Sequence, residues 1–410
     1  MAVERSPERL ALTDPVADAA RVRALAPTAA SVTADVEAIV AAVRDGGDAA
    51  LRGFVERFDG VDGQLVVTDE ELRAALDALD PAVRAGLEVA VANVGIVAEA
   101  GIAADRDVEL PQGHTVRLRE VPVRRAAVYA PGGRAAYPSS VVMGVVTARA
   151  AGVDEVVVCA PGAHPVILAA AALCSADAVF RMGGAHAIAA LAYGTETVRR
   201  ADVIVGPGGL YVQEAKRLVS GVVGIDGFAG PSDVLVLASY GADPELIALD
   251  LAAQAEHGEG TIVCAVSDDA AILDALAFEP AAAAAALLDA PDLDTALAFA
   301  EAFAPEHLEL VGAAAERLAP RVRSAGCVFV GASSATAFGD YVAGSNHTLP
   351  TGGAARFASG LNVRHFRRRV SEVRIGDAAG ALAGPGAAIA EAEGFDVHAA
   401  SMRVRENRSS

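Results

Sequence analysis

Apolar residues recur at every third or fourth position from Ser31 to about Ala104. This spacing lines one face of an α-helix with apolar side chains, so it predicts a helical segment. A glycine pair at positions 46 and 47 interrupts the pattern, and a further helix is expected after Pro81, since glycine and proline both disfavour a continuous helix. Residues 1–30 lack the pattern and contain three prolines, which predicts a short irregular arm.

The pattern changes at about Arg124 to short valine-rich runs, each followed by a glycine or proline turn and then by an alanine-rich stretch with helical spacing. The runs are AAVYA, EVVVCAP, AVFRMGG, ADVIVGPGG and DVLVLAS. Buried strands that alternate with helices indicate right-handed crossovers and a parallel sheet. A second series, GTIVCAVSD, ELVG and GCVFVGA, follows with more helix between its members. The predicted fold class is α/β.

The two series of strands predict two α/β domains, as the chain length also does. We expect residues 31–123 and 234–360 to form a first α/β domain and residues 124–233 to be inserted into it as a second. Residues 361–410 are expected to form a small C-terminal appendage.

Composition narrows the class of protein. The chain has 410 residues, of which 53% are hydrophobic and 4% aromatic, and its formal net charge is −20. That charge argues against nucleic acids and anionic membrane surfaces as partners. Lysine occurs once, at Lys216, which we interpret as coding bias and not as a binding patch. The longest apolar run, Ala281–Leu288, is short of the ~20 residues that a membrane-spanning helix needs.

Four cysteines lie far apart without a C-x-x-C pair, and three of them stand in or beside valine-rich runs. This placement indicates buried thiols in a reducing compartment. The N-terminal residues carry charges where a signal peptide would need an apolar run. We therefore expect a soluble, cytoplasmic protein.

The stretch from Asp243 to Gly258 has the residues that begin and end a helix. Asp243 suits the N-cap, Pro244 the first turn and Gly258 a left-handed C-terminal position. On this helix Gln254 and His257 are predicted to share a face with large aliphatic residues. Polar groups that face a core need partners. Taken alone, the two residues also fit an ordinary hydrogen-bonded pair in a core.

Three further stretches combine histidine with acidic residues. APEHLEL contains Glu306 and His307, FGDYVAGSNHTLPTGG contains Asp340 and His347, and AEGFDVH contains Glu393 and His398. Two imidazoles, a carboxylate and an amide oxygen form a ligand set that suits zinc, and manganese or cobalt would also accept it. Individually, Asp340 also fits a helix cap and His398 a surface position, so the argument depends on their joint occurrence.

These stretches resemble the histidinol dehydrogenase family. The similarity runs from RDGGDAALRGFVERFDG to AEAEGFDVHAASMRVR and includes QAEH, APEHLEL, GDYVAGSNHTLPTGG and FAGPSD in the family's order and spacing. It implies two α/β domains with incomplete Rossmann-like parallel sheets, small terminal segments and a homodimer with shared active sites. It also implies oxidation of L-histidinol to L-histidine through L-histidinaldehyde, with two NAD used in turn.

The resemblance also assigns roles to individual residues. It implies a zinc ion held by Gln254, His257, Asp340 and His398 of the partner subunit, with Glu306 and His307 as the catalytic pair. These six residues, together with Ser232, His347 and Glu393, match positions around the substrate. An imidazole is the base expected to remove the alcohol proton, and a glutamate suits the water that adds to the aldehyde.

The dinucleotide contacts of the family are matched less well. They include a tyrosine, a glutamine and an asparagine, where this chain has Tyr129, His186 and Gly209. Losing one neutral hydrogen bond costs about 0.5–1.5 kcal/mol, so weaker NAD binding is expected. The region 268–301 is also shorter than in the family. Two alternatives stay open: a paralogous zinc- and NAD-dependent dehydrogenase for another polar alcohol, and a metal-binding paralogue without turnover.

Overall fold

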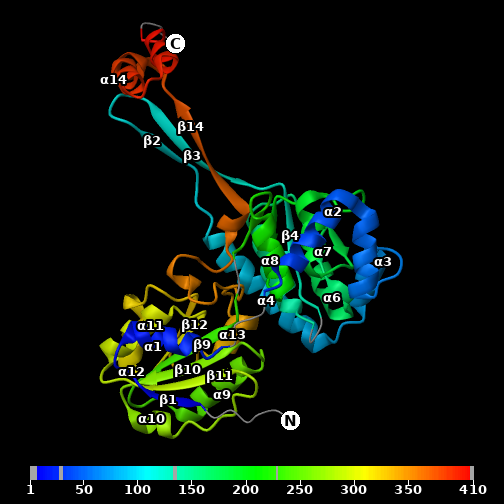
Figure 1. The fold of residues 1–410 in the computed structure, drawn as a ribbon, viewed down its shortest axis with the longest axis vertical. Coiled ribbons are helices and arrows are strands. Elements are labelled where there is room, and N and C mark those ends of the chain that lie inside the picture. Colours follow the sequence, from blue (N-terminus) through cyan, green and yellow to red (C-terminus); the bar gives the residue numbers. More distant parts are fainter. Residues whose placement is uncertain (1–6, 27–30, 133–135, 228–229, 407–410) are drawn as a thin grey trace. The chain divides into compact units, whose positions relative to one another are not determined.

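The protein is described by a computed structural model that covers residues 7–26, 31–132, 136–227 and 230–406 (Figure 1). The chain divides into two compact units. The first comprises residues 1–101 and 124–366, and the second comprises residues 102–123 and 367–410. Each unit is described by itself.

A six-stranded parallel sheet forms one half of the first unit, with the order β1-β11-β10-β9-β12-β13. In that order the strands are β1 (Glu8–Ala11), β11 (Ala284–Asp289), β10 (Ile262–Ser267), β9 (Asp233–Ala238), β12 (His307–Val311) and β13 (Cys327–Val330). The helices of this half are α1 (Pro15–Arg23), α9 (Pro244–Ala255), α10 (Ala270–Asp274), α11 (Leu293–Phe303), α12 (Ala313–Glu316) and α13 (Thr336–Tyr341). Alternate residues of β9 enter two apolar clusters, one with α1 and α11 and the other with α9 and α10. The sheet is therefore covered on both faces.

Two expectations about this half were wrong. The N-terminal arm is not irregular, because residues 8–11 form the edge strand β1 and Asp14 caps α1, with Pro15 in the first turn where its missing N–H is not needed. The alanine run that begins at 281 is not helical: its residues 284–289 form β11, between β1 and β10. Alanine favours helices, but a strand with both faces covered needs only apolar side chains.

A five-stranded parallel sheet forms the other half of the first unit, with the order β6-β5-β4-β7-β8. Its strands are β4 (Arg125–Tyr129), β5 (Glu155–Cys159), β6 (Ala178–Phe180), β7 (Val203–Val205) and β8 (Gly224–Ile225). The helices are α2 (Thr33–Phe54), the π-helical turn η1 (Val55–Asp59), α3 (Asp69–Asp77), α4 (Pro81–Ala100), α5 (Pro138–Ala150), α6 (Pro165–Leu173), α7 (Gly184–Tyr193) and α8 (Leu210–Val219). Short 3-10 turns in the first unit are η2 (Pro161–Ala163), η3 (Ala319–Arg321), η4 (Ala354–Arg356) and η5 (Val363–Phe366).

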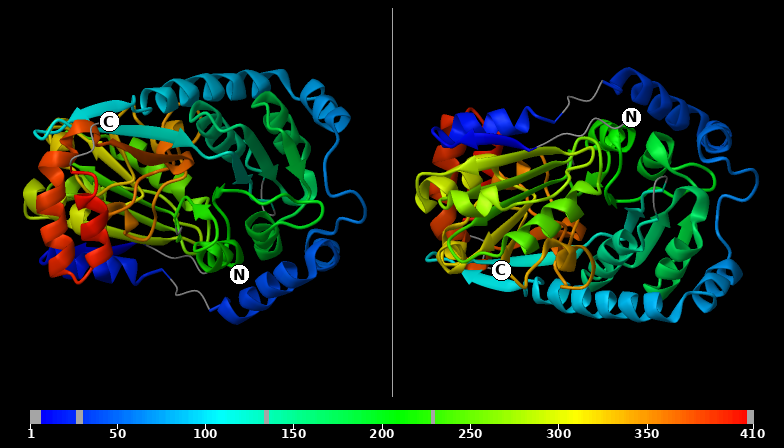
Figure 2. Two further views of the ribbon diagram at one scale, coloured as in Figure 1. Left: turned by 90° about the horizontal axis from the view of Figure 1, so that it is seen from above. Right: turned by 90° about the horizontal axis from the view of Figure 1, so that it is seen from below.

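The helices of residues 33–100 pack mainly on the half of the first unit that contains this second sheet, whereas the sequence predicts a domain shared with residues 234–360. α4 also contacts those residues, because the side-chain N–H of Asn93 donates to the carbonyl of Val342 at 2.7 Å. The apolar stripe of α2, Val36, Val40 and Val43, is buried in one cluster with Ala127 of β4 and with residues of α7. α3 packs against α6, and α4 lies alongside α5 (Figure 2). The periodicity of these helices identified the face that is buried, but it did not identify the sheet that buries it.

The second unit contains a three-stranded antiparallel sheet with the order β14-β3-β2 (Figure 1). Its elements are β2 (Arg106–Glu109), β3 (Thr115–Pro122), β14 (Arg367–Arg374), η6 (Gly376–Ala378), α14 (Ala379–Ala392) and α15 (Asp396–Arg403). α14 and α15 pack around Ala387, Ala390 and Ala399. The expected appendage therefore begins at about residue 367, and it includes residues 102–123, which we had placed in the first domain.

Among the described residues, α4 is the one helix that is long and apolar enough to cross a membrane. Its residues Leu87, Ala90 and Val94 are buried, and it packs against α5. One such helix is weak evidence for a membrane span, because packed helices of soluble proteins meet the same criteria.

The close approach of α5 to β4 gives a first prediction. A Cβ added at Gly144 would lie 2.5 Å from Cγ1 of Val128, so we expect Gly144→Ala to lower the free energy of unfolding by about 1–3 kcal/mol. Gly86 in α4 has no atom within 4 Å of the same position. Gly86→Ala is the matched control and should stabilise the protein by up to ~1 kcal/mol through helix propensity. Thermal unfolding of both variants tests this, and equal midpoints would contradict the packing argument.

Candidate functional site

Glu306 and His307 lie where the chain enters β12. Ala304 ends α11 in a left-handed conformation, and His307 is the first residue of the strand. In the sheet His307 pairs with Val234 of β9 and Cys327 of β13. The dyad therefore sits at the amino-terminal edge of the six-stranded sheet, beside the start of β9.

The carboxyl group of Glu306 is buried and held by two donors. The hydroxyl of Ser232 donates to Oε2 at 2.5 Å and the backbone N–H of Asp233 donates to the same oxygen at 3.1 Å. In return, the backbone N–H of Glu306 donates to Oδ1 of Asp233 at 2.8 Å. Burial, and then the charge of Asp233, raise the pKa of Glu306 well above its usual value.

The imidazole of His307 is 3% exposed, and its orientation is fixed by the backbone. Its Nδ1 lies 3.3 Å from the carbonyl oxygen of Asp233, so Nδ1 carries the proton that donates to that oxygen and Nε2 keeps a lone pair. Nε2 lies 3.7 Å from Oδ1 of Asp340. Burial is the main cause that lowers the pKa of His307 to about 4. At neutral pH the ring is therefore an uncharged proton acceptor.

Asp233, which the sequence reasoning missed, contacts both members of the dyad and is itself fully buried. Its Oδ2 accepts a hydrogen bond from Arg23 of α1 at 2.7 Å. The same guanidinium donates to the carbonyl of Phe303 at 2.7 Å and lies over that ring. Burial raises the pKa of Asp233, and Arg23 opposes this shift. Arg23 and Asp233 are 210 residues apart in the chain, so no local sequence pattern could identify them as a pair.

The two predicted ligands of α9 differ in their surroundings. Gln254 is 2% exposed and its side-chain N–H donates to the hydroxyl of Ser232 at 2.5 Å. His257 lies beyond the end of the helix and is exposed, so the prediction that it faces a core was wrong. Its Nδ1 donates to the carbonyl of Gln254 at 3.1 Å, which leaves the Nε2 lone pair available. Metal-bound histidines usually have their second nitrogen anchored in this way.

Asp340 lies on α13 and is partly buried. Burial raises its pKa, and the neighbouring His257 opposes the shift. Within the described ranges, no group of three or more His, Cys, Asp and Glu side chains is arranged to hold a metal. The predicted ligand set combines His257, Asp340 and the amide of Gln254, which belong to the first unit, with His398, which belongs to the second unit.

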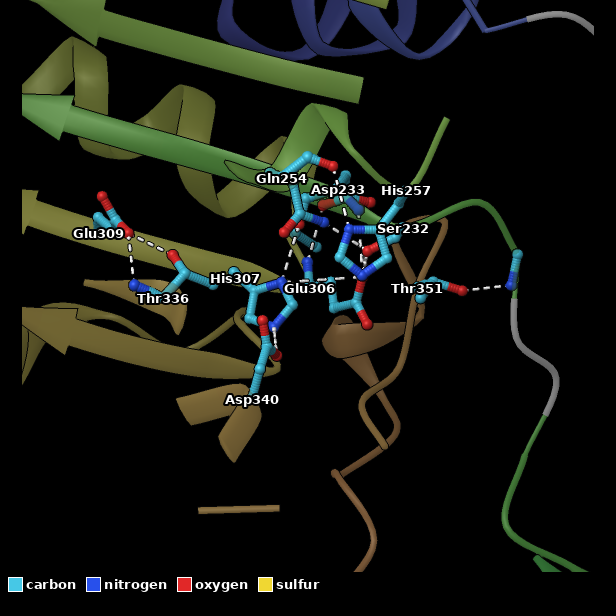
Figure 3. Close-up of polar contacts among 12 residues, drawn as sticks. Ser232, Asp233, Gln254, His257, Glu306, His307, Glu309, Thr336, Asp340 and Thr351 are labelled. Carbon is cyan, nitrogen blue, oxygen red and sulfur yellow. Dashed lines mark hydrogen bonds and ion pairs between the residues drawn. The ribbon is translucent and has the colours of Figure 1, made fainter. Parts of the chain in front are cut away.

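A cavity of about 660 Å³ joins several of these groups, although Gln254 and Asp233 are not among its lining residues. Ser232, His257, Glu306, His307, Asp340 and His347 all line it. Figure 3 shows the dyad directed toward Ser232 and Asp340. Nε2 of His347 is buried and has no hydrogen-bond partner among the described residues, and burial lowers the pKa of this residue to about 4. His347 thus has a free polar atom at the cavity.

The cavity extends to a glycine turn at the carboxyl end of β7. Gly206 there has φ +115°, and a Cβ on it would lie 2.2 Å from the carbonyl oxygen of Tyr129. Lys216 is 1% exposed; it donates to the carbonyl of Gly206 at 2.8 Å and pairs with Asp226, which accepts from the Gly206 N–H at 2.7 Å. The single lysine therefore has a structural role in this turn, which coding bias does not explain.

The three residues predicted to contact NAD, which are Tyr129, His186 and Gly209, lie in different surroundings. Gly209, at the N-terminus of α8, lines the cavity. The hydroxyl of Tyr129 accepts from the backbone N–H of Gly184 at 3.1 Å. His186 is 2% exposed, lies 2.9 Å from Oδ2 of Asp59 and stacks with the rings of Phe54 and Phe58. Its contact with a dinucleotide stays a prediction.

Glu393 and His398 belong to the second unit, where both are exposed. Glu393 caps α14, and His398 lies on α15 with its ring 5.2 Å from that of Phe395. The cavity of the first unit is built without them.

One cavity is lined by a buried carboxyl–imidazole dyad, by side chains of the types that bind metals and by a glycine turn. Together with the two parallel sheets, these features place the protein in the class of α/β enzymes. A sequence model described as histidinol dehydrogenase matches residues 23–406. A histidinol dehydrogenase of Haloarcula marismortui is 46% identical over 92% of this chain and 94% of its own length. That of Rhizobium meliloti is 42% identical over 92% of each chain.

A solved structure agrees with these sequence matches. The crystal structure of histidinol dehydrogenase from Elizabethkingia anophelis has a TM-score of 0.91 at 28% identity, and the match covers 97% of this chain and 98% of that one. The chain belongs to the histidinol dehydrogenase family, whose members are oxidoreductases of histidine biosynthesis. The predicted family and fold class are thereby confirmed.

The ion pair between the partly buried Arg23 and the buried Asp233 gives a second prediction. Arg23→Met leaves Asp233 without its countercharge, so we expect a loss of about 2–4 kcal/mol in the free energy of unfolding. Adding Asp233→Asn should restore part of the loss. Arg21→Met on the same helix removes only the exposed ion pair with Glu8 and should cost less than about 1 kcal/mol. Denaturant titration of the three variants checks this, and equal losses in Arg21→Met and Arg23→Met would refute it.

Proposed function

We propose that this chain oxidises L-histidinol to L-histidine through L-histidinaldehyde, in two steps that each pass a hydride to NAD. The observation that carries the proposal is the convergence of the Glu306–His307 dyad, Asp340 and His347 on one cavity that also reaches the glycine turn. The family membership and the presence of both dyad residues support L-histidinol as the substrate.

In the first step a hydride leaves the carbinol carbon as the alcohol proton is removed. Nε2 of His307 is the base, because the contact of Nδ1 with Asp233 fixes the tautomer with its lone pair on Nε2. The low pKa of the ring keeps it unprotonated before the reaction. The products of this step are the aldehyde, NADH and one proton.

In the second step water adds to the aldehyde, and the hydrate passes its hydride to a second NAD to give the carboxylate. Glu306 is the group that orients this water and takes its proton. Ser232 and Asp233 hold one carboxyl oxygen. The raised pKa brings Glu306 closer to the range in which it accepts a proton at working pH.

We propose zinc as the metal and assign its ligands to Gln254, His257, Asp340 and His398 of a second subunit. The anchored Nδ1 of His257 and the partly buried carboxylate of Asp340 suit such an ion. When bound, zinc would orient the imidazole and amine of the substrate beside the dyad. His347 and Glu393 are proposed as further substrate contacts. The unpartnered Nε2 of His347 is ready to bind a polar ligand.

We also propose a cytoplasmic homodimer. The free cysteines are consistent with a reducing compartment. A two-fold dimer would present the exposed His398 of each subunit to the cavity of the other, since a symmetric interface gives each subunit the same contacts.

The test is NADH formation by the purified, zinc-loaded protein with L-histidinol, followed by its absorbance. We expect two NADH for each histidine formed. Turnover with other polar alcohols but not with histidinol would favour the paralogous dehydrogenase. Zinc binding without any turnover would favour the metal-binding paralogue. The contact of His186 with Asp59 favours this alternative, because it occupies a side chain that was predicted to contact NAD.

Replacing the base gives a third prediction. His307→Asn removes the proton acceptor and leaves all four proposed ligands in the chain, so turnover should fall by about 10²–10⁴-fold while bound zinc stays near one per subunit. Steady-state kinetics and elemental analysis measure the two quantities. Loss of zinc in this variant would contradict the assigned role.

Sharing of the site between subunits gives a fourth prediction. His257→Ala and His398→Ala each should abolish zinc-dependent turnover, because each removes one ligand from every site. If His398 crosses to the other subunit, a heterodimer of the two variants has one intact site. Unfolding and refolding them together should then restore about a quarter of wild-type activity, since about half of the dimers are mixed. No recovery in refolded mixtures that contain heterodimers would show that each site lies within one chain.

A further inference from the structure

A buried ion pair supports the glycine turn after β7 and takes no part in the chemistry proposed above. Lys216 on α8 and Asp226, the residue after β8, form the pair, and their side chains are 1% and 7% exposed. Both residues line the cavity. An apolar pair of similar volume would fill the same space at a lower cost in desolvation. What the pair holds therefore explains its presence better than packing does.

The pair binds both polar groups of Gly206. The backbone N–H of Gly206 donates to Oδ2 of Asp226 at 2.7 Å, and Nζ of Lys216 donates to the Gly206 carbonyl at 2.8 Å. The ammonium group also donates to Oδ1 of Asp226, which closes a ring of hydrogen bonds. Because Gly206 has a positive φ, the ring fixes the peptide groups on both sides of a residue whose conformation only glycine adopts freely.

The turn that the pair holds leads directly into α8. Gly208 has no room for a side chain, because a Cβ on it would lie 2.5 Å from Cγ1 of Val212. Gly209, the N-cap of α8, provides no side-chain cap. Backbone without side chains therefore lines the cavity at the start of a ten-residue helix. The first N–H groups of a helix lack partners within it and attract anions, so this backbone suits a phosphate group of the dinucleotide.

A second feature of the cavity also indicates a polar ligand. Ser140 of α5 is 2% exposed and lines the cavity. Its hydroxyl is buried and has no hydrogen-bond partner among the described residues. A buried polar group of this kind is stabilised when a ligand bonds to it. Ser140 and the glycine turn belong to different elements, so the two indications are independent.

We propose that Lys216 and Asp226 are positioning residues for the dinucleotide: they hold the peptide groups of Gly206 so that the start of α8 keeps the place and orientation that a phosphate group needs. The inference rests on the proposed function, in which NAD is the hydride acceptor. Lys216 is not itself a phosphate ligand, because its ammonium group is buried and already donates to Asp226 and to the Gly206 carbonyl. Its effect on binding is exerted through the turn.

The test separates positioning from direct attraction by the lysine charge. Lys216→Met removes the ammonium group, whereas Asp226→Ala removes the carboxylate and keeps the positive charge of Lys216. Positioning predicts weaker NADH binding in both variants, and direct attraction predicts it in Lys216→Met alone. Arg217→Met is the matched control, because it removes the same charge from the next residue of α8, where the exposed Arg217 pairs with Glu214.

NADH affinity is measured by the fluorescence of the bound nucleotide, at a temperature at which circular dichroism shows every variant folded. The double variant Lys216→Met/Asp226→Asn contains no unpaired buried charge, so it replaces the single variants if these unfold. It should also weaken NADH binding, because the hydrogen bond to the Gly206 carbonyl is lost.

We expect Lys216→Met and Asp226→Ala to weaken NADH binding by about 10–100-fold, as the loss of charge-assisted hydrogen bonds to a phosphate group would. The KM for NAD should rise in parallel. Zinc affinity, measured by competition with a chelator, and the KM for histidinol should stay within about threefold of wild type, because distant sites are nearly independent. Arg217→Met should leave all of these quantities unchanged.

Three results would overturn the positioning role: wild-type NADH affinity in the folded variants, a loss confined to Lys216→Met, or an equal loss in Arg217→Met. A purely structural role would lower the unfolding temperature and weaken zinc and NADH binding alike, which would also contradict the proposal.

Failure of the proposed function gives a different result. Wild-type protein that binds NADH but does not oxidise histidinol overturns the proposed substrate, and the NADH affinities of the variants still decide the positioning role. Wild-type protein that oxidises histidinol, with variants that bind NADH as tightly, overturns the positioning role alone. Wild-type protein that binds no NADH overturns both.

Discussion

The hydrogen bonds around Asp233 determine the geometry of this site. Its backbone N–H and side chain hold Glu306, and its carbonyl fixes the tautomer of His307. These contacts depend on the register of two neighbouring strands, in which His307 pairs with Val234. A shift of one residue would turn the dyad to the other face of the sheet. Arg23 supplies the countercharge for Asp233, so α1 is part of the support of the site.

The two sheets of the first unit contribute opposite edges to the cavity. The five-stranded sheet contributes the glycine turn at the carboxyl end of β7, which is the edge at which parallel α/β sheets usually bind ligands. The six-stranded sheet contributes its amino-terminal edge, through Ser232 and the first residues of β12. In the proposed hydride transfer, the substrate would lie at the dyad on one edge and the dinucleotide at the glycine turn on the other.

Burial sets the protonation of the dyad before any ligand arrives. The same lack of water that raises the pKa of Glu306 lowers that of His307 to about 4, because both shifts disfavour the charged form. The imidazole is thus a neutral base, and the carboxyl group takes a proton more readily than an exposed glutamate does. With Asp233 and Glu309, the sheet that carries the dyad contains several buried carboxyl groups, each held by hydrogen-bond donors.

The sequence by itself determined the features that are local. Apolar periodicity located most helices and the parallel strands, the cap residues placed the start of α9 at Asp243 and Pro244, and the dense motifs around His307 identified the family. Only the tertiary structure decided which surfaces meet. It assigned the helices of residues 33–100 to the five-stranded sheet, made a strand of residues 284–289, and joined Arg23 to Asp233 and Glu309 to Thr336. The physical reason is that periodicity and capping depend on neighbours in the chain, whereas burial, countercharge and long-range hydrogen bonds depend on groups brought together only by folding.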